Sequence, residues 1–202
     1  MSPRVREDSV RPRRLSSASG RPSTSPLDVS RKGVIAGLTA VVLIAGALLW
    51  ADGPTPSLPS GTKADLLVVD KSTRRLSVYA NGALVRSYSV SLGHHPVGPK
   101  EREGDHRTPE GRYVIDHHNP NSAFHLSLHI SYPSASDSAR AFAAGYSPGG
   151  EVMVHGMRNG SGWIGRAHLL VDWTDGCIAV TDAEMDQLYQ AVSDGTPIEI
   201  RP

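Results

Sequence analysis

The single cysteine of this 202-residue chain lies between a turn-forming stretch and an apolar one. Asp175-Gly176 precedes the thiol and favours a sharp bend. Ile178 to Val180 follows it and is typical of a short buried strand. Cys177 is therefore predicted to lie where a turn enters a strand, with backbone amides around it. Amides in that position stabilise a developing oxyanion, which is the environment that a nucleophile requires.

A nucleophilic Cys177 also needs a base or a positive neighbour, because a thiol with the usual pKa of about 8.5 is mostly protonated at neutral pH. The best candidate is His155, which ends the apolar run Val152 to Val154 and is followed by Gly156. The alternative is that a lone cysteine serves as a small buried hydrophobic residue. The rest of the chain has to decide between the two.

The chain begins with a basic segment. Residues 1–32 contain eight Lys and Arg and three acidic residues, are rich in Ser and Pro, and show no apolar periodicity. They are predicted to be a disordered tail. Of the totals of 21 basic and 20 acidic residues, 13 and 17 then remain for the rest of the chain. A basic tail often contacts nucleic acid or anionic lipid, and the next segment favours the membrane.

Residues 33–50, GVIAGLTAVVLIAGALLW, carry no charge. As a helix they would span about 27 Å, close to the roughly 30 Å of a bilayer core. Arg31 and Lys32 precede them and the next basic residue is Lys63, so the positive-inside bias places the tail in the cytoplasm. The pattern predicts a single-pass anchor in the cytoplasmic (inner) membrane, with the remainder exported. A cleaved signal sequence, with Ala45-Gly46-Ala47 as its site, is the alternative.

Residues 51–63, rich in Pro and Gly, are predicted to be an extended linker to the exported part. One cysteine cannot form an intrachain disulfide there, so the thiol stays free, which favours a chemical role. Residues 64–202 are long enough for one domain with its own core. The chain thus divides into a tail at 1–32, an anchor at 33–50, a linker at 51–63 and a domain at 64–202.

The domain is predicted to be mainly β, a mixed sheet or sandwich with two short helices, preceded by the transmembrane helix. A hairpin is indicated by alternating runs at 75–79 and 83–90 around Asn81-Gly82. One helix is predicted over 134–144 with Asp137 as a cap. The other starts with a Thr181–Glu184 capping box and ends at Gly195. Further strands are expected at 65–70, 113–115, 124–130, 152–155 and 197–200.

Three sequence blocks carry a resemblance to a known family. They are 69–82, with Val69-Asp70-Lys71 and the Asn81-Gly82 turn; 89–111, with Gly93 and Gly104 to Gly111; and His155-Gly156 followed by Gly176-Cys177-Ile178. In this order they resemble the L,D-transpeptidase catalytic domain of bacterial cell-wall enzymes, the YkuD or ErfK/YbiS/YcfS/YnhG type. The resemblance covers about residues 65–202.

The resemblance implies a thioester mechanism on peptidoglycan stem peptides, with no cofactor. Cys177 would be the nucleophile and His155 the base and then the acid. The carbonyl of Gly156 would orient His155, and the amide of Gly176 would contribute to the oxyanion hole. This matches the chemistry expected from the residues themselves.

The sequence departs from the family pattern at two positions. Many members have Ser-His-Gly-Cys where this chain has Thr174-Asp175-Gly176-Cys177. The Asp175 carboxylate would raise the pKa of the thiol unless it points away or pairs with a cation, and it could simply form the turn. Many members also have Arg or Asn where Ala179 stands, which leaves open how a substrate carboxylate is held.

The string from Asp172 to Val180 is similar to a subgroup of murein-processing enzymes, some of which hydrolyse a lipoprotein–wall link, so transfer and hydrolysis both stay open. Other loop and aromatic residues are candidates for substrate binding, with loop solvation or packing as the alternative role. The substrate-binding candidates are Lys100, Asp105, Thr108, Trp163, His168, Trp173, Thr174 and Asp175.

Two other classes of function compete with an enzyme: a wall-binding module without turnover, and a thiol redox or metal protein. The absence of a second cysteine disfavours redox cycling. The nine histidines invite a metal site, yet His125 and His129 would lie about 13 Å apart along a strand, at roughly 3.3 Å per residue. The pairs His94-His95 and His117-His118 are interpreted as surface or groove histidines. We therefore expect no metal and no nucleic-acid partner; a zinc D,D-peptidase would not need Cys177.

Overall fold

The structure is a computed structural model that describes residues 35–43, 46 and 57–202. Residues 35–43 are helical. Within the described ranges, no helix is long and apolar enough to cross a membrane. The predicted tail at 1–32 lies outside these ranges, as do parts of the predicted anchor at 33–50 and of the linker at 51–63, so all three stay predictions. The chain separates into two units, Met1–Val41 and Val42–Pro202, and the sheet belongs to the second.

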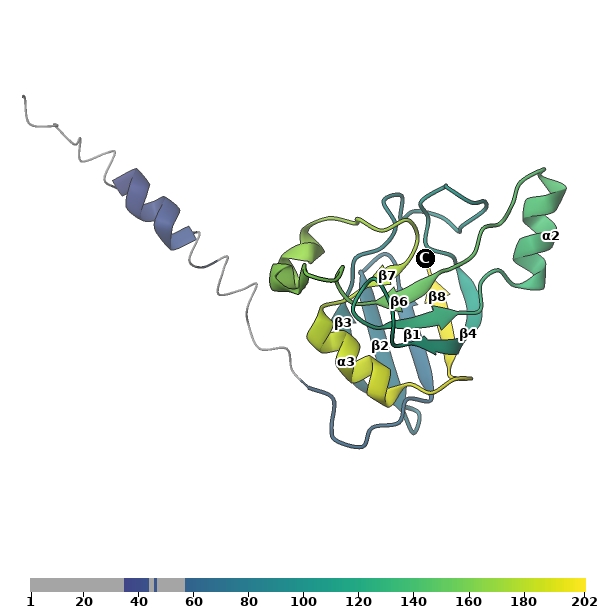
Figure 1. Cartoon of the computed structure of the whole chain (residues 1–202), viewed down its shortest axis with the longest axis horizontal. Helices are drawn as coiled ribbons and strands as arrows, with labels where there is room; N and C mark the ends of the chain where they lie inside the picture. Colours follow the sequence, from purple (N-terminus) through teal and green to yellow (C-terminus); the bar gives the residue numbers. More distant parts are fainter. Residues whose placement is uncertain (1–34, 44–45, 47–56) are drawn as a thin grey trace, which may run out of the picture. The chain divides into compact units, whose positions relative to one another are not determined.

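The domain is built on one mixed sheet of eight strands in the order β3-β2-β1-β8-β4-β5-β6-β7, curved as a half-barrel (Figure 1). The mainly β prediction is confirmed, but as one sheet and not as a sandwich of two. Strand β8 pairs with both β1 and β4 and so joins the N-terminal hairpin to the later strands. The strands are β1 (Leu66–Asp70), β2 (Arg75–Ala80), β3 (Ala83–Ser89), β4 (Gly111–Asn119), β5 (Ser127–Ile130), β6 (Met153–His155), β7 (Ile178–Ala179) and β8 (Pro197–Arg201).

The β2–β3 hairpin forms where the sequence predicts it. Asn81 and Gly82 both have positive φ, 53° and 72°, as a two-residue type I′ turn requires. Ala80 pairs with Ala83 across the turn. The strand bounds differ farther along the chain: β4 is longer than 113–115, and β5 starts at Ser127 and not at 124. His125, with φ of 62°, lies outside β5, so it does not share a strand with His129 as expected.

Two α-helices follow the predicted positions. Helix α2 (Ala135–Ala143) is capped by Ser134 and not by Asp137; Asp137 is the third helical residue, and the two residues bond reciprocally in a capping box. Helix α3 (Asp182–Ala191) has the predicted Thr181–Glu184 capping box. It ends at Ala191, before Gly195, because Val192 is already extended with ψ of 144°.

The core lies between the sheet and α3. Met185 and Leu188 of α3 are fully buried against strand residues that include Val154 of β6 and Ile178 of β7. Complete burial of one such side chain contributes about 1.5–3 kcal/mol. A further helical segment, the 3₁₀ helix η1 (Gly162–Leu170), was not predicted. The packing under β6 and β7 therefore fixes the strand that ends at His155 and the strand that begins directly after Cys177.

Candidate active site

His155 and Cys177 are brought together by a pair of parallel strands. Val154 pairs with Ile178 and His155 with Ala179, so the end of β6 lies beside the start of β7. Cys177 immediately precedes β7. Both side chains line one cavity of about 590 Å³. The two residues proposed from sequence as base and nucleophile therefore share a cavity, although 21 residues separate them along the chain.

The orientation of His155 is set by its neighbour. Its Nδ1 lies 2.7 Å from the carbonyl oxygen of Gly156. A carbonyl can only accept, so Nδ1 carries the proton and Nε2 presents a lone pair. Burial lowers the pKa of His155, and the bond to Gly156 only partly opposes this. The imidazole is thus neutral at pH 7, the form that a base requires.

Gly156 accepts no larger side chain. A Cβ at this position would lie 2.7 Å from a carboxylate oxygen of Asp182 and 3.0 Å from the Cβ of His125. The Asp182 carboxylate also accepts a hydrogen bond from the backbone N–H of Met157, at 2.7 Å. The helix α3 that starts at Asp182 therefore holds the segment after His155 in place.

The Cys177 thiol is half-buried and donates to the carbonyl of Glu151, at 3.6 Å. Burial raises the pKa of Cys177, and the negative charges of Asp175 and Glu151 raise it further. A hydrogen bond from the Met153 backbone and the positive charge of Lys100 act in the opposite direction. At rest, the site therefore pairs a protonated thiol with a neutral imidazole. Proton transfer must accompany the attack on a substrate.

The turn before the thiol is fastened by Thr174. Its hydroxyl donates to the carbonyl of Cys177, at 2.7 Å, and accepts from the N–H of Gly176, at 3.2 Å. The amide of Gly176, proposed for the oxyanion hole, is thus already bonded. Gly176 has φ of 134°, and a Cβ there would lie 2.7 Å from the carbonyl oxygen of Arg107, so the loop before β4 packs directly against this turn.

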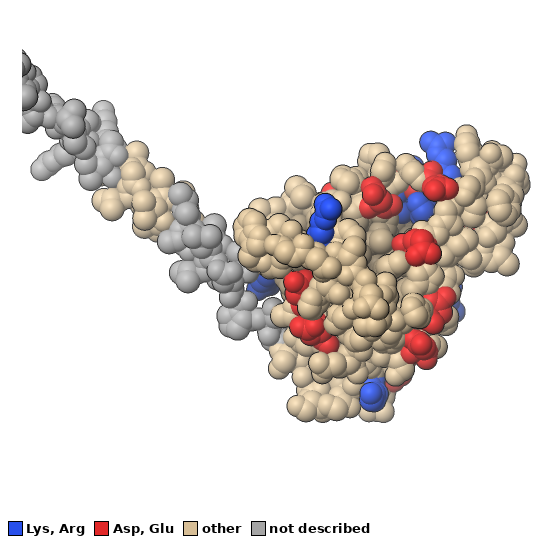
Figure 2. Space-filling model, in the orientation of Figure 1, with Lys and Arg blue, Asp and Glu red and all other residues tan. Residues whose placement is uncertain are grey.

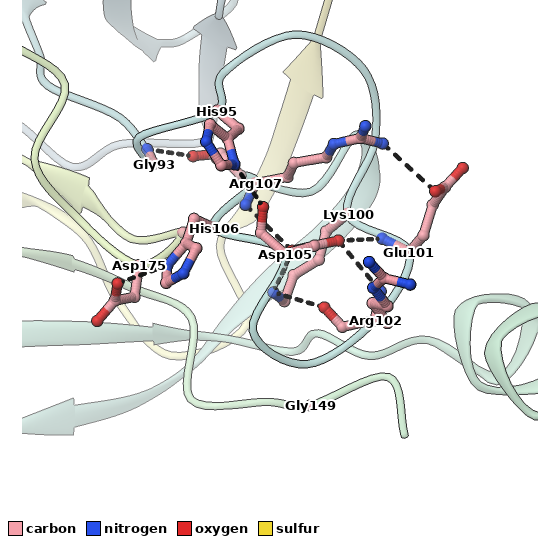
Figure 3. A network of polar contacts seen from close by, with 12 residues as sticks. Gly93, His95, Lys100, Glu101, Arg102, Asp105, His106, Arg107, Gly149 and Asp175 are labelled. Atoms are coloured by element: carbon pink, nitrogen blue, oxygen red, sulfur yellow. Dashed lines mark hydrogen bonds and ion pairs between the residues drawn. The ribbon is translucent and has the colours of Figure 1, made fainter. Parts of the chain in front are cut away.

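That loop, residues 93–111, forms one side of the site (Figure 3). Lys100 and Asp105 form a buried ion pair at 2.8 Å. Asp105 also accepts from the N–H groups of Glu101, Arg102 and Arg107. Burial raises the pKa of Asp105, but the bond from Lys100 and the three backbone bonds outweigh it, so the net shift is downward. Asp105 therefore organises the loop, whereas Lys100 lines a second cavity of about 450 Å³ that reaches Cys177.

Thr108, like Asp105, holds the loop in place. Its side chain is fully buried and its hydroxyl accepts from the N–H of Gly93, at 3.1 Å. It lines neither of the two cavities that reach Cys177. The structure thus separates the three loop candidates: Lys100 faces the site, while Asp105 and Thr108 hold the loop that carries it.

Asp175 pairs with a residue that the sequence analysis did not single out. Its carboxylate lies 2.7 Å from Nδ1 of His106, as Figure 3 shows. The pairing with a basic group that the sequence left open is thus found, but the carboxylate still raises the pKa of Cys177. Both side chains line the cavity of about 450 Å³ next to Cys177. The available signal was a histidine within the Gly-rich block 104–111.

The aromatic candidates also divide into one that lines the cysteine cavity and two that do not. Trp173 lines the cysteine cavity, and its ring lies 5.7 Å from that of His155. Trp163 is 81 % exposed in η1 and does not line that cavity. His168 is buried; its Nδ1 accepts from the indole N–H of Trp173, at 3.4 Å. His168 therefore positions Trp173 and does not itself line the cavity of Cys177.

Arg158 was not identified from sequence. It lines the cysteine cavity, and no other Lys or Arg does so. Its side chain is exposed, and no acidic partner for it is found in residues 57–202. On the face shown in Figure 2, Lys and Arg side chains are few and scattered among acidic and uncharged ones. An unpaired cation beside the thiol is suited to an anionic group on a substrate.

Comparisons with known proteins agree with this geometry. The family model YkuD, L,D-transpeptidase catalytic domain, matches residues 64–200. YafK of Escherichia coli strain K12, provisionally named an L,D-transpeptidase, is 28% identical over 130 residues, which are 61% of this chain and 45% of that protein. The chain therefore spans about half the length of the curated relatives it matches.

The fold is shared with a solved structure. The helical cell shape determining protein Pgp2 from Campylobacter jejuni is 22% identical, with a TM-score of 0.51 over 77% of this chain and 54% of that one. An L,D-transpeptidase from Mycobacterium smegmatis is 19% identical, with a TM-score of 0.46 over 69% of this chain and 59% of that one.

Proposed function

Because the chain belongs to the YkuD family of L,D-transpeptidase catalytic domains, we propose that it is a cysteine-dependent L,D-transpeptidase of peptidoglycan. One observation carries the proposal. Cys177 and His155 line a single cavity at the start of β7 and the end of β6, and the Gly156 carbonyl holds His155 with its Nε2 free to accept a proton. A thiol, a base and a group that orients the base are the components of nucleophilic acyl transfer.

In the proposed reaction, the Cys177 thiol gives its proton to Nε2 of His155 as the sulfur attacks the carbonyl that precedes a terminal D-amino acid. His155 then returns the proton to the departing amine, and a thioester remains on Cys177. The amine of a second stem peptide attacks the thioester and gives its proton to His155. Collapse restores the thiol and completes an amide cross-link.

The groups around Cys177 and His155 are suited to different stages of this reaction. Before attack, burial keeps the thiol protonated and His155 neutral. During attack, the Met153 amide and the Lys100 charge favour the thiolate. The oxyanion would be held by amides of the 174–177 turn, with Gly176 available if the Thr174 hydroxyl turns away from it.

Arg158 is proposed as the anchor for a stem-peptide carboxylate. Many relatives are expected to place an Arg or Asn at the position of Ala179, two residues after the cysteine. Here that position is Ala179, which is fully buried in β7 beside His155 and carries no charge. Arg158 follows the end of β6, three residues after His155, and lines the same cavity. Its guanidinium would supply the positive charge that Ala179 lacks.

Residues 33–50 are proposed to anchor the chain in the cytoplasmic membrane, with the domain on the extracytoplasmic side. Their uncharged composition and the basic residues before them support the proposal. An anchored chain keeps its N-terminus when mature, whereas cleavage after the Ala45-Gly46-Ala47 site would give an N-terminus near residue 48.

The test incubates the purified full-length chain with defined tetrapeptide muropeptides and identifies the products by mass spectrometry. We expect cross-linked dimers and the released terminal amino acid, and only background turnover with Cys177→Ser. The fold should persist in that variant because the two side chains are close in size. The matched control is His129→Ala, a partly exposed histidine of β5 that pairs with Asp116 and lines neither cavity that reaches Cys177.

The products also separate the alternatives. Trimmed monomers without dimers, or release of a wall-linked protein, would identify water as the acceptor and make the chain a hydrolase with the same nucleophile. Binding to the wall with no product would indicate a non-catalytic module. Undiminished turnover by Cys177→Ser would remove the thioester mechanism altogether.

A further inference from the structure

Three potential metal ligands converge beside the cysteine turn. His94, His106 and Asp175 each offer one ligand atom, and these atoms all lie within 4.8 Å of one another. They come from three places in the sequence, so neighbouring-residue spacing could not reveal them. The pairs weighed from sequence, such as His94 with His95, do not include this combination.

We propose that His94, His106 and Asp175 form a binding site for a divalent transition-metal ion of the Zn²⁺ type. Two imidazole nitrogens and one carboxylate oxygen are a ligand set that Zn²⁺ takes, with the fourth position left to water. Binding of the ion stands independently of the proposed transpeptidase activity. Its effect on turnover, described below, rests on that proposed function.

His94 is already oriented as a ligand. Its Nδ1 lies 2.9 Å from the carbonyl oxygen of Thr174, which can only accept, so Nδ1 carries the proton and Nε2 presents its lone pair. A bond from the second ring nitrogen to a backbone carbonyl is the usual support of a metal-binding histidine. Thr174 precedes Asp175, so a single turn orients one ligand and supplies another.

The backbone around the three ligands is tied together. The N–H of His94 donates to the Thr174 carbonyl at 3.0 Å, and the N–H of His95 donates to the His106 carbonyl at 3.1 Å. The His94 and His106 rings lie edge to face, with centroids 5.7 Å apart. The buried Lys100–Asp105 pair holds the same loop from within, next to His106 and Asp175 (Figure 3). The ligands therefore sit on a fixed frame.

Only the side chains need to move when the ion enters. Zn²⁺ at 2.0–2.1 Å from tetrahedral ligands places the ligand atoms about 3.3 Å apart. The spread of up to 4.8 Å must therefore close by roughly 1.5 Å at its widest. His94 and Asp175 are exposed residues, and the ion would take the place of the hydrogen bond between His106 and Asp175.

Three other His–Asp pairs show what is special here. His118–Asp194, His125–Asp186 and His129–Asp116 have the same short N···O distances, 2.6–2.7 Å. Within the described part of the chain, none of them gains a third ligand. A His–Asp pair by itself is thus common in this domain, and the second histidine distinguishes the proposed site. These pairs are matched internal controls.

The position of the site predicts its consequence. His106 and Asp175 line the cavity of about 450 Å³ that also reaches Cys177. An ion held by them would occupy part of that cavity. We therefore expect Zn²⁺ to reduce turnover of muropeptides by limiting access to the thiol from this side.

The test is a titration of the full-length chain with Zn²⁺ against a chromophoric chelator and by calorimetry. We expect one equivalent to bind, and at least tenfold weaker binding in His94→Ala and in His106→Ala. His129→Ala, which breaks a His–Asp pair of the same length, should bind as the unaltered chain does. Circular dichroism of each variant checks that the fold is kept.

Cys177→Ser separates this site from direct capture of the ion by the thiol. Retained binding in Cys177→Ser supports the histidine cluster, whether or not the variant shows any turnover. Loss of binding in Cys177→Ser, or unchanged binding in His94→Ala and His106→Ala, would overturn the proposal. Binding that is reduced equally by His129→Ala would do the same, because it would point to scattered surface histidines.

Discussion

The two walls of the cysteine site are stabilised in opposite ways. One, the aromatic wall, consists of Phe124, His155 and Trp173, whose rings contact one another, and burial lowers the pKa of the His155 imidazole. The other, the loop wall, consists of Lys100, His106 and Asp175, held by ion pairs within the loop and across to the turn. The nucleophile thus lies between a neutral surface and a charged one.

Under the proposed mechanism, the contrast accounts for a thiol that is protonated at rest and reactive toward a substrate. The aromatic wall removes water and keeps His155 in its base form, which favours proton transfer from the thiol. The loop wall supplies the positive charge of Lys100, which favours the thiolate once it forms, against the opposing charge of Asp175. His106 holds that carboxylate to the loop side. If the comparison is right, the walls should respond to different perturbations.

The largest effect is expected from the charge that organises the loop wall. Asp105→Ala removes the ion-pair partner of Lys100, whose side chain is 5 % exposed, and also the acceptor of three backbone N–H groups. Removal of one member of a buried pair costs about 3–5 kcal/mol. We expect a loss of that size in the free energy of unfolding, measured by urea denaturation.

Asp116→Ala is the matched control for that experiment, because Asp116 pairs with His129 at the surface, where such pairs contribute about 0–1 kcal/mol. Lys100→Met should cost less than Asp105→Ala, since Asp105 keeps its three backbone donors. Equal, small losses for Asp105→Ala and Asp116→Ala would show that the loop wall does not depend on its buried charge.

The aromatic wall should be sensitive to acid. Burial, with a smaller contribution from the nearby His155, lowers the pKa of His168 to about 4, against an ordinary value of 6.5. The unfolded chain therefore binds a proton at this residue below about pH 6.5 while the folded chain does not. Stability from His168 is complete above pH 6.5 and is lost as the pH falls toward 4, by about 3 kcal/mol.

The measurement compares urea denaturation at pH 7.5 and pH 4.5. His168→Asn, whose side-chain oxygen can still accept from Trp173, should flatten this pH dependence. His125→Asn, at a partly exposed histidine that pairs with Asp186, should leave the dependence as it is. A pH dependence that is the same in His168→Asn and the unaltered chain would contradict a neutral buried imidazole behind Trp173.

The same contrast separates what the sequence could predict from what it could not. The strand that ends at His155 and the strand that follows Cys177 were predicted, because an apolar run next to a glycine is a local signal. The type I′ hairpin and the Thr181–Glu184 capping box were predicted for the same reason, since each needs residues within four positions. Features set by neighbouring residues can be predicted without knowing the fold.

The contacts of the loop wall could not be predicted in that way. The pairing of His106 with Asp175 spans 69 positions and depends on how the loop folds over Gly176. Thr108 and Asp105 looked like groove residues but are occupied by backbone groups of the loop itself. The capping residue of α2 was misplaced by three positions, because Ser134 and Asp137 both suit a cap and the sequence does not rank them.

The smallest effect is expected from Arg158, which lies at the edge of the aromatic wall. If its guanidinium holds a substrate carboxylate, Arg158→Ala should raise the KM for tetrapeptide muropeptides about tenfold, which corresponds to about 1.4 kcal/mol, and leave kcat nearly unchanged. The effect is limited because the side chain is exposed and the ion pair stays screened by water.

Arg158→Lys tests whether charge or shape matters at that position. A lysine keeps the charge but loses the paired N–H groups of the guanidinium, so partial recovery of KM is expected. Arg112→Ala removes another exposed arginine, from β4, and should change neither constant. A fall in kcat with unchanged KM in Arg158→Ala would instead assign Arg158 to the transition state. That result would mean that a charge on the aromatic side also acts on the reaction itself, and it would contradict the contrast between the two walls.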